Sequence, residues 1–199
     1  MNNPLINKSL AKSSNYSNYR TSVQNLLKQE KSTGKEQSSV LLDYSILNNK
    51  RMDRLDKTIS LTEETKKTTD LLTEKITMLV IAEGWCGDAA QIIPVLNKIA
   101  SFSPKIDLKI VLRDENEDLM NLFLTNGSKS IPKVIILNNE NSIVETWGPR
   151  PSIASKMVEN FKLQHGSLNA EFKKDLQLWY NKDKGLSIQE DFIEIFKSV

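Results

Sequence analysis

A continuous apolar run, ITMLVIA at residues 76–82, most constrains how this chain folds. Short unbroken apolar runs bounded by turn residues are typical of strands that are buried on both faces of a parallel sheet. The run leads into the turn EGWCGDAAQ at 83–91, and apolar residues then recur at helical spacing up to Ala100. The pattern predicts a buried strand, a sharp turn and a helix, which is how an α/β domain begins.

The following segments extend the same domain. Apolar and polar residues alternate over 106–112, which predicts a second strand, and a short helix is expected near 119–123. Two further strands, 133–137 and 142–147, are joined by the turn Asn138-Asn-Glu-Asn141 and predict an antiparallel hairpin. An amphipathic segment over 153–161 predicts a covering helix. The predicted order over residues 74–162 is therefore β-α-β-α-β-β-α.

Helical patterns flank this core on both sides. Residues 16–73 contain three predicted helices, and no flexible linker separates them from the first strand, so we expect them to dock on the core. Residues 163–199 predict a helical C-terminal extension, and residues 1–15 are polar enough to predict a disordered tail. Ser60 and Ser187, each with a Glu three residues later, are predicted helix N-caps.

Composition excludes several classes of function. The 199 residues include one Cys and one His, which rules out an internal disulfide and the usual self-contained zinc or His-triad sites. The net charge of +2 is too small to indicate binding to nucleic acid or to an acidic membrane. No apolar run is long enough for a membrane span, and the N-terminus lacks the apolar segment of a secretory signal. We therefore expect a cytoplasmic protein without metal or cofactor.

The order of elements, with Cys86 at the junction of the first strand and helix, resembles the thioredoxin fold. Pro94 follows Cys86 by eight residues, where thioredoxins bend their active-site helix, and Ser130-Ile131-Pro132 occupies the place of the family's cis-proline loop. Gly148 follows Pro132 by sixteen residues and matches the glycine that lines the thioredoxin substrate groove. More narrowly, the stretches EGWCGDAAQ, RDEN, SIPK and WGPRP resemble a bacterial branch of single-cysteine thioredoxin family proteins with a WCGDA motif.

Two departures from the thioredoxin pattern concern the chemistry. The family's second cysteine, which resolves mixed disulfides, is Ala89 in this chain. The family's buried aspartate, six residues before the first cysteine, is Val80. Without a second thiol the chain has no self-contained dithiol–disulfide cycle.

Cys86 is the candidate catalytic residue. A thiol at a helix N-terminus is stabilised as thiolate by unpaired N–H groups and the helix dipole, and Gly87 keeps the turn open. The alternative is that Cys86 is a small buried apolar residue, as free cysteines commonly are. Asp88 either improves the electrostatics of the first helical turn or opposes a thiolate and acts as an acid or base. Trp85 either contributes to a substrate platform or packs the loop.

The resemblance also implies a peptide groove beside Cys86. Ile131, which precedes Pro132, would offer its backbone to an extended peptide, and Trp147 and Gly148 would line the same groove. This placement puts Arg150 near Cys86, where it would stabilise a thiolate or hold a carboxylate of a small thiol.

A basic stripe on the second of the three helices predicted over residues 16–73 has two interpretations. Lys50, Arg51, Arg54 and Lys57 form either a solvated face or a docking face whose arginines pair with Asp114 or Glu115. Arg113 and Asp114 are expected to form a structural ion pair.

Two functions follow from these residues. The first is a monothiol redox protein in which Cys86 forms a mixed disulfide with a protein or small thiol, and an external thiol resolves it. The second is a redox-inactive binding module that uses the groove around Pro132. A thiol pKa well below the free value of ~8.5 would favour the redox protein, and a buried thiol with a raised pKa would favour the module.

Overall fold

The computed structural model describes residues 3–199 and contains a mixed four-stranded sheet in the order β2-β1-β3-β4. β1 (Ile76–Ala82) pairs in parallel with β2 (Ile106–Leu112). β3 (Lys133–Leu137) pairs antiparallel with β1 and with β4 (Ile143–Trp147). The α/β thioredoxin-like fold predicted from the sequence is therefore confirmed, including the hairpin formed by β3 and β4.

The central strands are buried as their apolar sequences predict. From Met78 to Ala82 every residue of β1 is fully buried, and Val134–Leu137 of β3 is equally buried. Val80, which occupies the position of the thioredoxin aspartate, lies in this core. The carboxyl end of β1 therefore meets the following turn at the edge of a rigid apolar platform.

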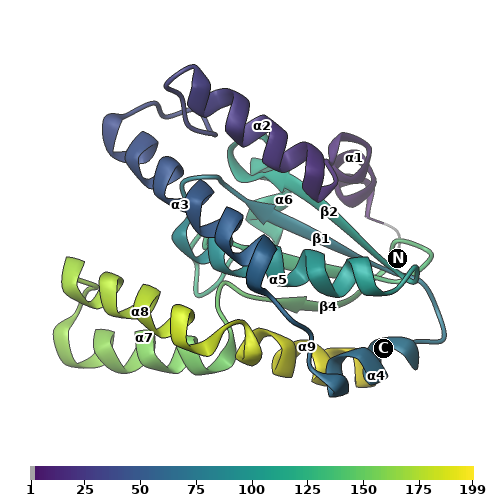
Figure 1. Cartoon of the computed structure of the whole chain (residues 1–199). Coiled ribbons are helices and arrows are strands. Elements are labelled where there is room, and N and C mark those ends of the chain that lie inside the picture. The colour runs from purple at the N-terminus through teal and green to yellow at the C-terminus, as the bar shows by residue number, and fades with distance from the viewer. Residues whose placement is uncertain (1–2) are drawn as a thin grey trace.

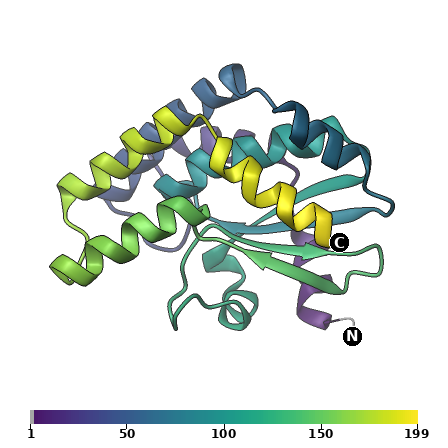
Figure 2. The same ribbon diagram turned by 90° about the horizontal axis from the view of Figure 1, so that it is seen from below.

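Helices cover both faces of the sheet. Figure 2 shows α5 (Gly87–Phe102) and α6 (Glu117–Leu122) on opposite sides of the strands. α5 contains Pro94, and most of its first three turns are buried. A single 3₁₀ turn, Arg113–Glu115, links β2 to α6, and α7 (Ser152–His165) follows β4.

The N-terminal extension is helical from Pro4 onwards and packs on the core (Figure 1). It consists of α1 (Pro4–Lys12), α2 (Tyr16–Lys28), α3 (Ser39–Thr58) and α4 (Glu63–Asp70). The expectation of a disordered tail over residues 1–15 is therefore corrected for residues 3–15, while residues 1 and 2 lie outside the described part of the chain. Asn3 caps α1, the Ile6 side chain is fully buried, and Ser14 exchanges two backbone hydrogen bonds with Ile110 of β2.

Buried polar contacts join the N-terminal helices to one another. Arg20 of α2 is almost fully buried and forms ion pairs with Asp53 and Asp56 of α3, at 2.5 and 3.7 Å. The predicted cap Ser60 is replaced by Thr62, whose hydroxyl accepts the N–H of Thr65. The cap is therefore two residues later than predicted and is a threonine rather than a serine, but its hydroxyl forms the same type of capping hydrogen bond.

The C-terminal extension continues from α7 into α8 (Ala170–Asp183) and α9 (Leu186–Ser198). α7 and α8 form an antiparallel pair that projects from the core, whereas α9 lies alongside α4 (Figure 1). α9 begins after Gly185 rather than at a serine cap, because Ser187 lies inside the helix and donates its hydroxyl to Asp183.

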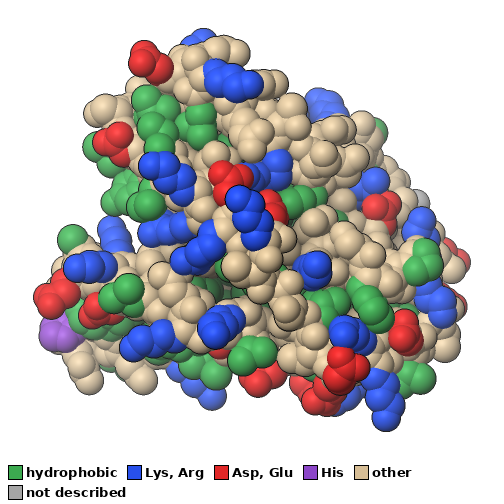
Figure 3. Space-filling view, viewed as in Figure 1, with side chains coloured by type: hydrophobic (Ala, Val, Ile, Leu, Met, Phe, Trp, Pro, Cys, Tyr) green, Lys and Arg blue, Asp and Glu red, His purple; other side chains and the backbone are tan. Residues whose placement is uncertain are grey.

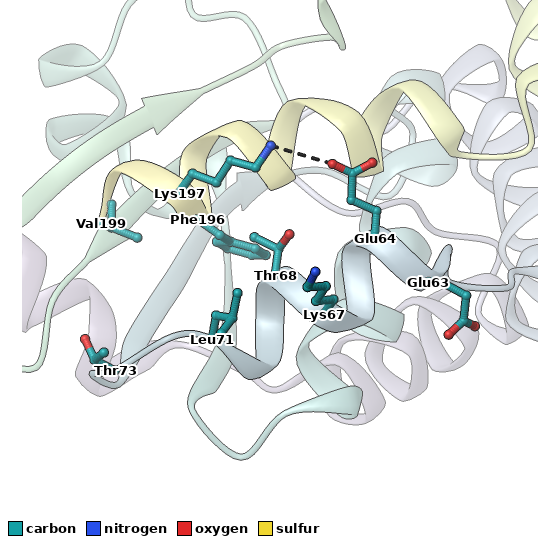
Figure 4. A pocket seen from close by; sticks show the side chains of 9 residues that line it. All are labelled: Glu63, Glu64, Lys67, Thr68, Leu71, Thr73, Phe196, Lys197 and Val199. Carbon is teal, nitrogen blue, oxygen red and sulfur yellow. Dashed lines mark ion pairs between the residues drawn. The ribbon is translucent and has the colours of Figure 1, made fainter.

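A pocket lies between α4 and α9 (Figure 4), and the residues that line it do not include those of the Cys86 turn. It has a volume of about 740 Å³ and is lined by both charges and apolar atoms, including Lys67, Leu71, Phe196 and Lys197. Among residues 3–199, no helix combines the length and apolar character needed to cross a membrane.

Candidate functional site

Cys86 is the N-cap of α5, at the point where the turn after β1 becomes helical. Its Sγ accepts the N–H of Ala89 at 3.4 Å and its thiol donates to the carbonyl of Ile131 at 3.3 Å. Only 8% of the residue is exposed. The sulfur therefore takes the position that a Ser or Asp oxygen takes in other helices, and it lies against the loop before Pro132.

Asp88 lies in the first turn of α5 and is buried between two other segments. Its carboxylate forms an ion pair with Arg150 at 2.7 Å and accepts a hydrogen bond from the Tyr180 hydroxyl at 3.0 Å. Asp88 is 7% exposed and Tyr180 is 2% exposed. α8 of the C-terminal extension thus covers the same helix terminus that carries Cys86.

These contacts decide which form of the thiol the site favours. Burial, and then the negative charge of Asp88, raise the pKa of Cys86 to about 12, although the Ala89 and Asp88 N–H groups and Arg150 act in the opposite direction. Burial also raises the pKa of Asp88, against the opposing effects of Arg150 and Tyr180. In this structure Cys86 is a protonated thiol at neutral pH.

The raised thiol pKa gives a prediction for stability at alkaline pH. Above about pH 8.5 the unfolded chain loses the thiol proton while the folded chain keeps it, so the folded state binds more protons and stability falls as pH rises. We expect Cys86 to contribute a decrease of up to about 1.4 kcal/mol per pH unit between about pH 9 and 10.5. Urea denaturation of the wild type and of Cys86→Ser over this range measures it, since the serine variant lacks this slope. Equal slopes in the two proteins would show that the folded thiol titrates normally.

The turn before Cys86 is held by the N-terminal extension. Thr33 accepts the N–H of Gly84 at 2.8 Å, and Asn48 of α3 donates to the Gly84 carbonyl at 3.0 Å. Both polar side chains are buried, so both backbone groups of Gly84 are satisfied by residues outside the thioredoxin-like core. The extension therefore positions the turn as well as covering it.

The opposite side of the turn is fixed by the end of β2. Glu83 is fully buried and accepts the N–H of Asp114 at 3.0 Å, and burial raises the pKa of its carboxyl group. Arg113 pairs with Asp114 at 2.9 Å and lies 4.8 Å from the centre of the Trp85 ring. The expected Arg113–Asp114 ion pair is present, and its arginine packs on Trp85, which is half-buried in the loop.

The residues of the expected peptide groove come together, but they are covered. The Ile131–Pro132 peptide bond is cis, as the resemblance implied, and the Gly148–Pro149 bond is cis as well. Gly148 has φ +108°, and a Cβ at this position would lie 2.4 Å from the Pro132 carbonyl oxygen, so only glycine fits. Ile131, Pro132 and Trp147 are buried, and Trp147 packs on Phe192 and donates its indole N–H to Asp191 at 2.8 Å. The C-terminal extension therefore occupies part of the expected groove.

The basic stripe on α3 points to the same helix terminus and does not pair with Asp114 or Glu115. Arg51 donates to Asn48 at 2.7 Å, and its Nη1 lies 3.5 Å from the position of a Cβ on Gly87. Arg54 lies 3.5 Å from the Gln91 side chain. Within residues 3–199 no residue of the stripe forms an ion pair, so its pairing with Asp114 or Glu115 is corrected. The ion pairs of Arg20 lie inside the extension, whereas Lys35 pairs with Glu117 of α6 at 2.8 Å.

Several residues of this site carry no sequence signal that identifies them. Tyr180 and Gln177 come from α8, about ninety residues after Cys86, and Asn48 and Thr33 come from well before it. A tyrosine or glutamine on an amphipathic helix is too ordinary to predict a contact of this kind. Only Asn48 has a distinguishing feature, because it lies one turn before Met52 on the face of α3 that also buries Leu55.

Fold and site together define a class: an α/β protein of thioredoxin-like fold with one buried cysteine at the first turn of the active-site helix. A family model described as thioredoxin matches residues 34–162. The chain belongs to this thioredoxin family. A search of curated proteins found no significant match.

Two solved structures are similar over most of the chain. A crystal structure of an HIV epitope scaffold aligns with a TM-score of 0.59 at 17% identity and covers 94% of this chain and 99% of the other. A protein of unknown function from Pseudomonas aeruginosa aligns with a TM-score of 0.51 at 17% identity and covers 73% of this chain and 86% of the other. At this level of identity both similarities concern the fold alone.

Proposed function

We propose that this protein is a thioredoxin-fold binding module for another protein, in which Cys86 caps and packs the active-site helix instead of exchanging disulfides. The observation that carries the proposal is the position of Sγ, which is buried and engaged on both sides by the Ile131 carbonyl and the Ala89 N–H. A thiolate attacks a disulfide along the line of the S–S bond, so the disulfide must be able to approach the attacking sulfur directly. The burial of Sγ and its two hydrogen bonds prevent such an approach to Cys86.

Two further features support the proposal. Ala89 stands where a resolving cysteine would be needed, so any mixed disulfide would have no internal route to release. Asp88 and Tyr180 place a carboxylate and a ring against the helix terminus, and the carboxylate raises the pKa of the thiol. Each feature reduces reactivity without weakening the fold.

The second candidate is the monothiol redox protein. It is favoured by the helix N-cap position of Cys86 and by Arg150, which both lower the pKa of the thiol. In this mechanism the Cys86 thiolate attacks a disulfide, forms a new S–S bond and releases one thiolate. An external thiolate then attacks the mixed disulfide, releases Cys86 and leaves a new disulfide. The reaction requires the groups that bury Cys86 to open and expose the sulfur.

Thiol chemistry separates the two candidates. We expect native Cys86 to be alkylated by iodoacetamide at pH 7.5 at least tenfold more slowly than the urea-unfolded chain, because a buried protonated thiol is a poor nucleophile. We also expect no mass addition after incubation with the disulfide of a small thiol. Mass spectrometry of the intact protein measures both. Rapid alkylation together with a stable one-to-one adduct would establish the monothiol mechanism.

A cellular comparison tests the binding role. Cys86→Ser preserves a cap at the start of α5 and should retrieve the same partner proteins as the wild type from a lysate. Cys86→Ala, which removes the cap, serves as the stability control. Loss of all partners in a correctly folded serine variant would overturn the proposal.

We also propose a branch of the family and a cellular location for this protein. The WCGDA stretch around Cys86 supports placement in the single-cysteine bacterial branch, and the lone cysteine supports a cytoplasmic location. The partner is proposed to be a protein, with no nucleic acid or membrane involved.

A further inference from the structure

Two helices from opposite ends of the chain meet above the Cys86 turn. A Cβ on Gly87 would lie 3.2 Å from Gln177 of α8 and 3.5 Å from Arg51 of α3. Away from this point the two helices diverge, so that the first half of α3 and the α7–α8 pair form the arms of a V (Figure 1). Figure 3 shows the surface hollowed between these arms. We refer to this hollow as the α3–α8 cleft.

The α3 wall of the cleft carries an apolar stripe that no other part of residues 3–199 covers. Val40, Tyr44 and Leu47 are spaced by four and three residues and are 59%, 46% and 44% exposed. Helical spacing places them on one face, and that face continues into Arg51. Apolar side chains are visible along this arm in Figure 3. An exposed apolar row that leads into a charged site is typical of an interaction surface.

The charges at the base of the cleft are predominantly positive. Arg51, Arg54 and Arg150 surround the first turn of α5, and the one carboxylate that contacts any of them in residues 3–199 is the buried Asp88. Burial, and then the charge of Arg54, lower the pKa of Arg51, while the charge of Asp88 acts in the opposite direction. Lys173 and Lys174 lie one turn before Gln177 on α8 and add exposed positive charge to the second wall.

The geometry points to a protein segment with acidic and large apolar side chains as the occupant of the α3–α8 cleft. Its apolar side chains would cover Val40, Tyr44 and Leu47, and its carboxylates would pair with the arginines at the base. This inference rests on the proposed binding function and names the surface and the chemistry of the partner. The apolar wall distinguishes the site from a nucleic-acid groove, which would continue the positive charge along the phosphate backbone.

Selection from a display library tests the inference without knowledge of the partner. A phage-displayed library of random 12-residue peptides is panned against the full chain, and the enriched peptides are synthesised with a fluorophore for anisotropy measurements. We expect enrichment in Asp or Glu together with Leu, Phe or Trp, and binding that weakens as salt is raised from 50 to 500 mM. An enriched pool without acidic excess would overturn the inference.

Variants locate the binding surface. The charge reversal Arg54→Glu/Lys174→Glu and the polar replacement Tyr44→Ser/Leu47→Ser change exposed side chains, and each should weaken binding about tenfold or more. The matched control Lys75→Glu/Lys98→Glu makes the same change in charge at the other end of β1 and should bind normally. Undiminished binding in both cleft variants would place the site elsewhere.

Two parallel measurements identify other occupants and separate this inference from the proposed function. Tighter binding of a labelled 20-nucleotide single strand than of the peptides, or a dimer in light scattering that Tyr44→Ser/Leu47→Ser dissociates, would each replace the acidic segment as occupant. All peptides are also measured against Cys86→Ser. Equal affinity keeps the proposed function intact, whereas peptides that bind only through an adduct on Cys86 would overturn it while leaving the cleft assignment in place.

Discussion

A shortened chain that begins at Glu74 is expected to be insoluble, or to unfold at a markedly lower temperature than the full chain. It lacks the apolar side chains by which the N-terminal helices bury the outer face of the core, among them Ile6, Tyr19, Val23, Met52 and Leu55. Burial of one such side chain stabilises a fold by about 1.5–3 kcal/mol. Since whole domains are stable by only about 5–15 kcal/mol, the loss of several exceeds what a domain tolerates. Solubility and thermal unfolding by circular dichroism measure the outcome.

A point variant tests whether the N-terminal extension stabilises the core through a specific hydrogen bond as well as by burying apolar surface. Asn48→Ala in the full chain removes the buried donor to the Gly84 carbonyl and should cost about 1–3 kcal/mol, because that carbonyl is left unsatisfied. Lys50→Ala, at an exposed position on the same helix, is the comparison and should change stability by less than about 0.5 kcal/mol. If the chain that begins at Glu74 melts at the same temperature as the full chain, the N-terminal extension does not contribute to the stability of the core.

Arg150→Ala is expected to lower the free energy of unfolding by about 3 kcal/mol near pH 7.5, because it leaves Asp88 as a buried carboxylate without its cation. The loss should be smaller at pH 5.5. Burial already raises the pKa of Asp88, and removal of Arg150 raises it further, so the folded variant binds a proton that the unfolded chain lacks and gains stability as pH falls. The same change removes a positive charge near Cys86 and should make thiol alkylation slower still.

Urea denaturation at the two pH values measures the effect of Arg150→Ala. Lys98→Ala, an exposed cation on α5, is the matched control and should change stability by less than about 0.5 kcal/mol. A loss for Arg150→Ala that is equal at both pH values would show that Asp88 does not titrate in this range. A loss as small as that of the control would show that the Asp88–Arg150 pair contributes no net stability.

The parts of this structure that depend on short-range patterns could be predicted from the sequence. The apolar run of β1, the alternation of β2 and the turn at Asn138 predicted the succession of strands along the chain and the antiparallel pairing of β3 with β4. The spacing between Pro132 and Gly148 placed two distant residues in contact, because a resemblance to a known fold supplies long-range geometry that periodicity does not.

The cover over Cys86 could not be predicted in this way. Nothing local distinguishes Tyr180 from any other tyrosine on an amphipathic helix, and its contact with Asp88 depends on how α7 and α8 turn back. The sequence left open whether Cys86 is a reactive thiol or a buried apolar residue. The structure buries it, with the charges of Asp88 and Arg150 acting on its pKa in opposite directions. The N-terminal tail was misjudged for a related reason: its polar composition predicts disorder, but one buried side chain, Ile6, and the pairing of Ser14 with Ile110 hold it in place.

The pairing of Ser14 with Ile110 also has a consequence for how the chain matures on the ribosome. Ser14 is synthesised roughly 100 residues before Ile110, which corresponds to about 5–20 s at ordinary elongation rates. During that interval α1 and α2 carry apolar faces with no sheet to cover. The nascent chain therefore passes through a stage in which α1 and α2 are available to chaperones, and β2 ends that stage when it is released from the exit tunnel.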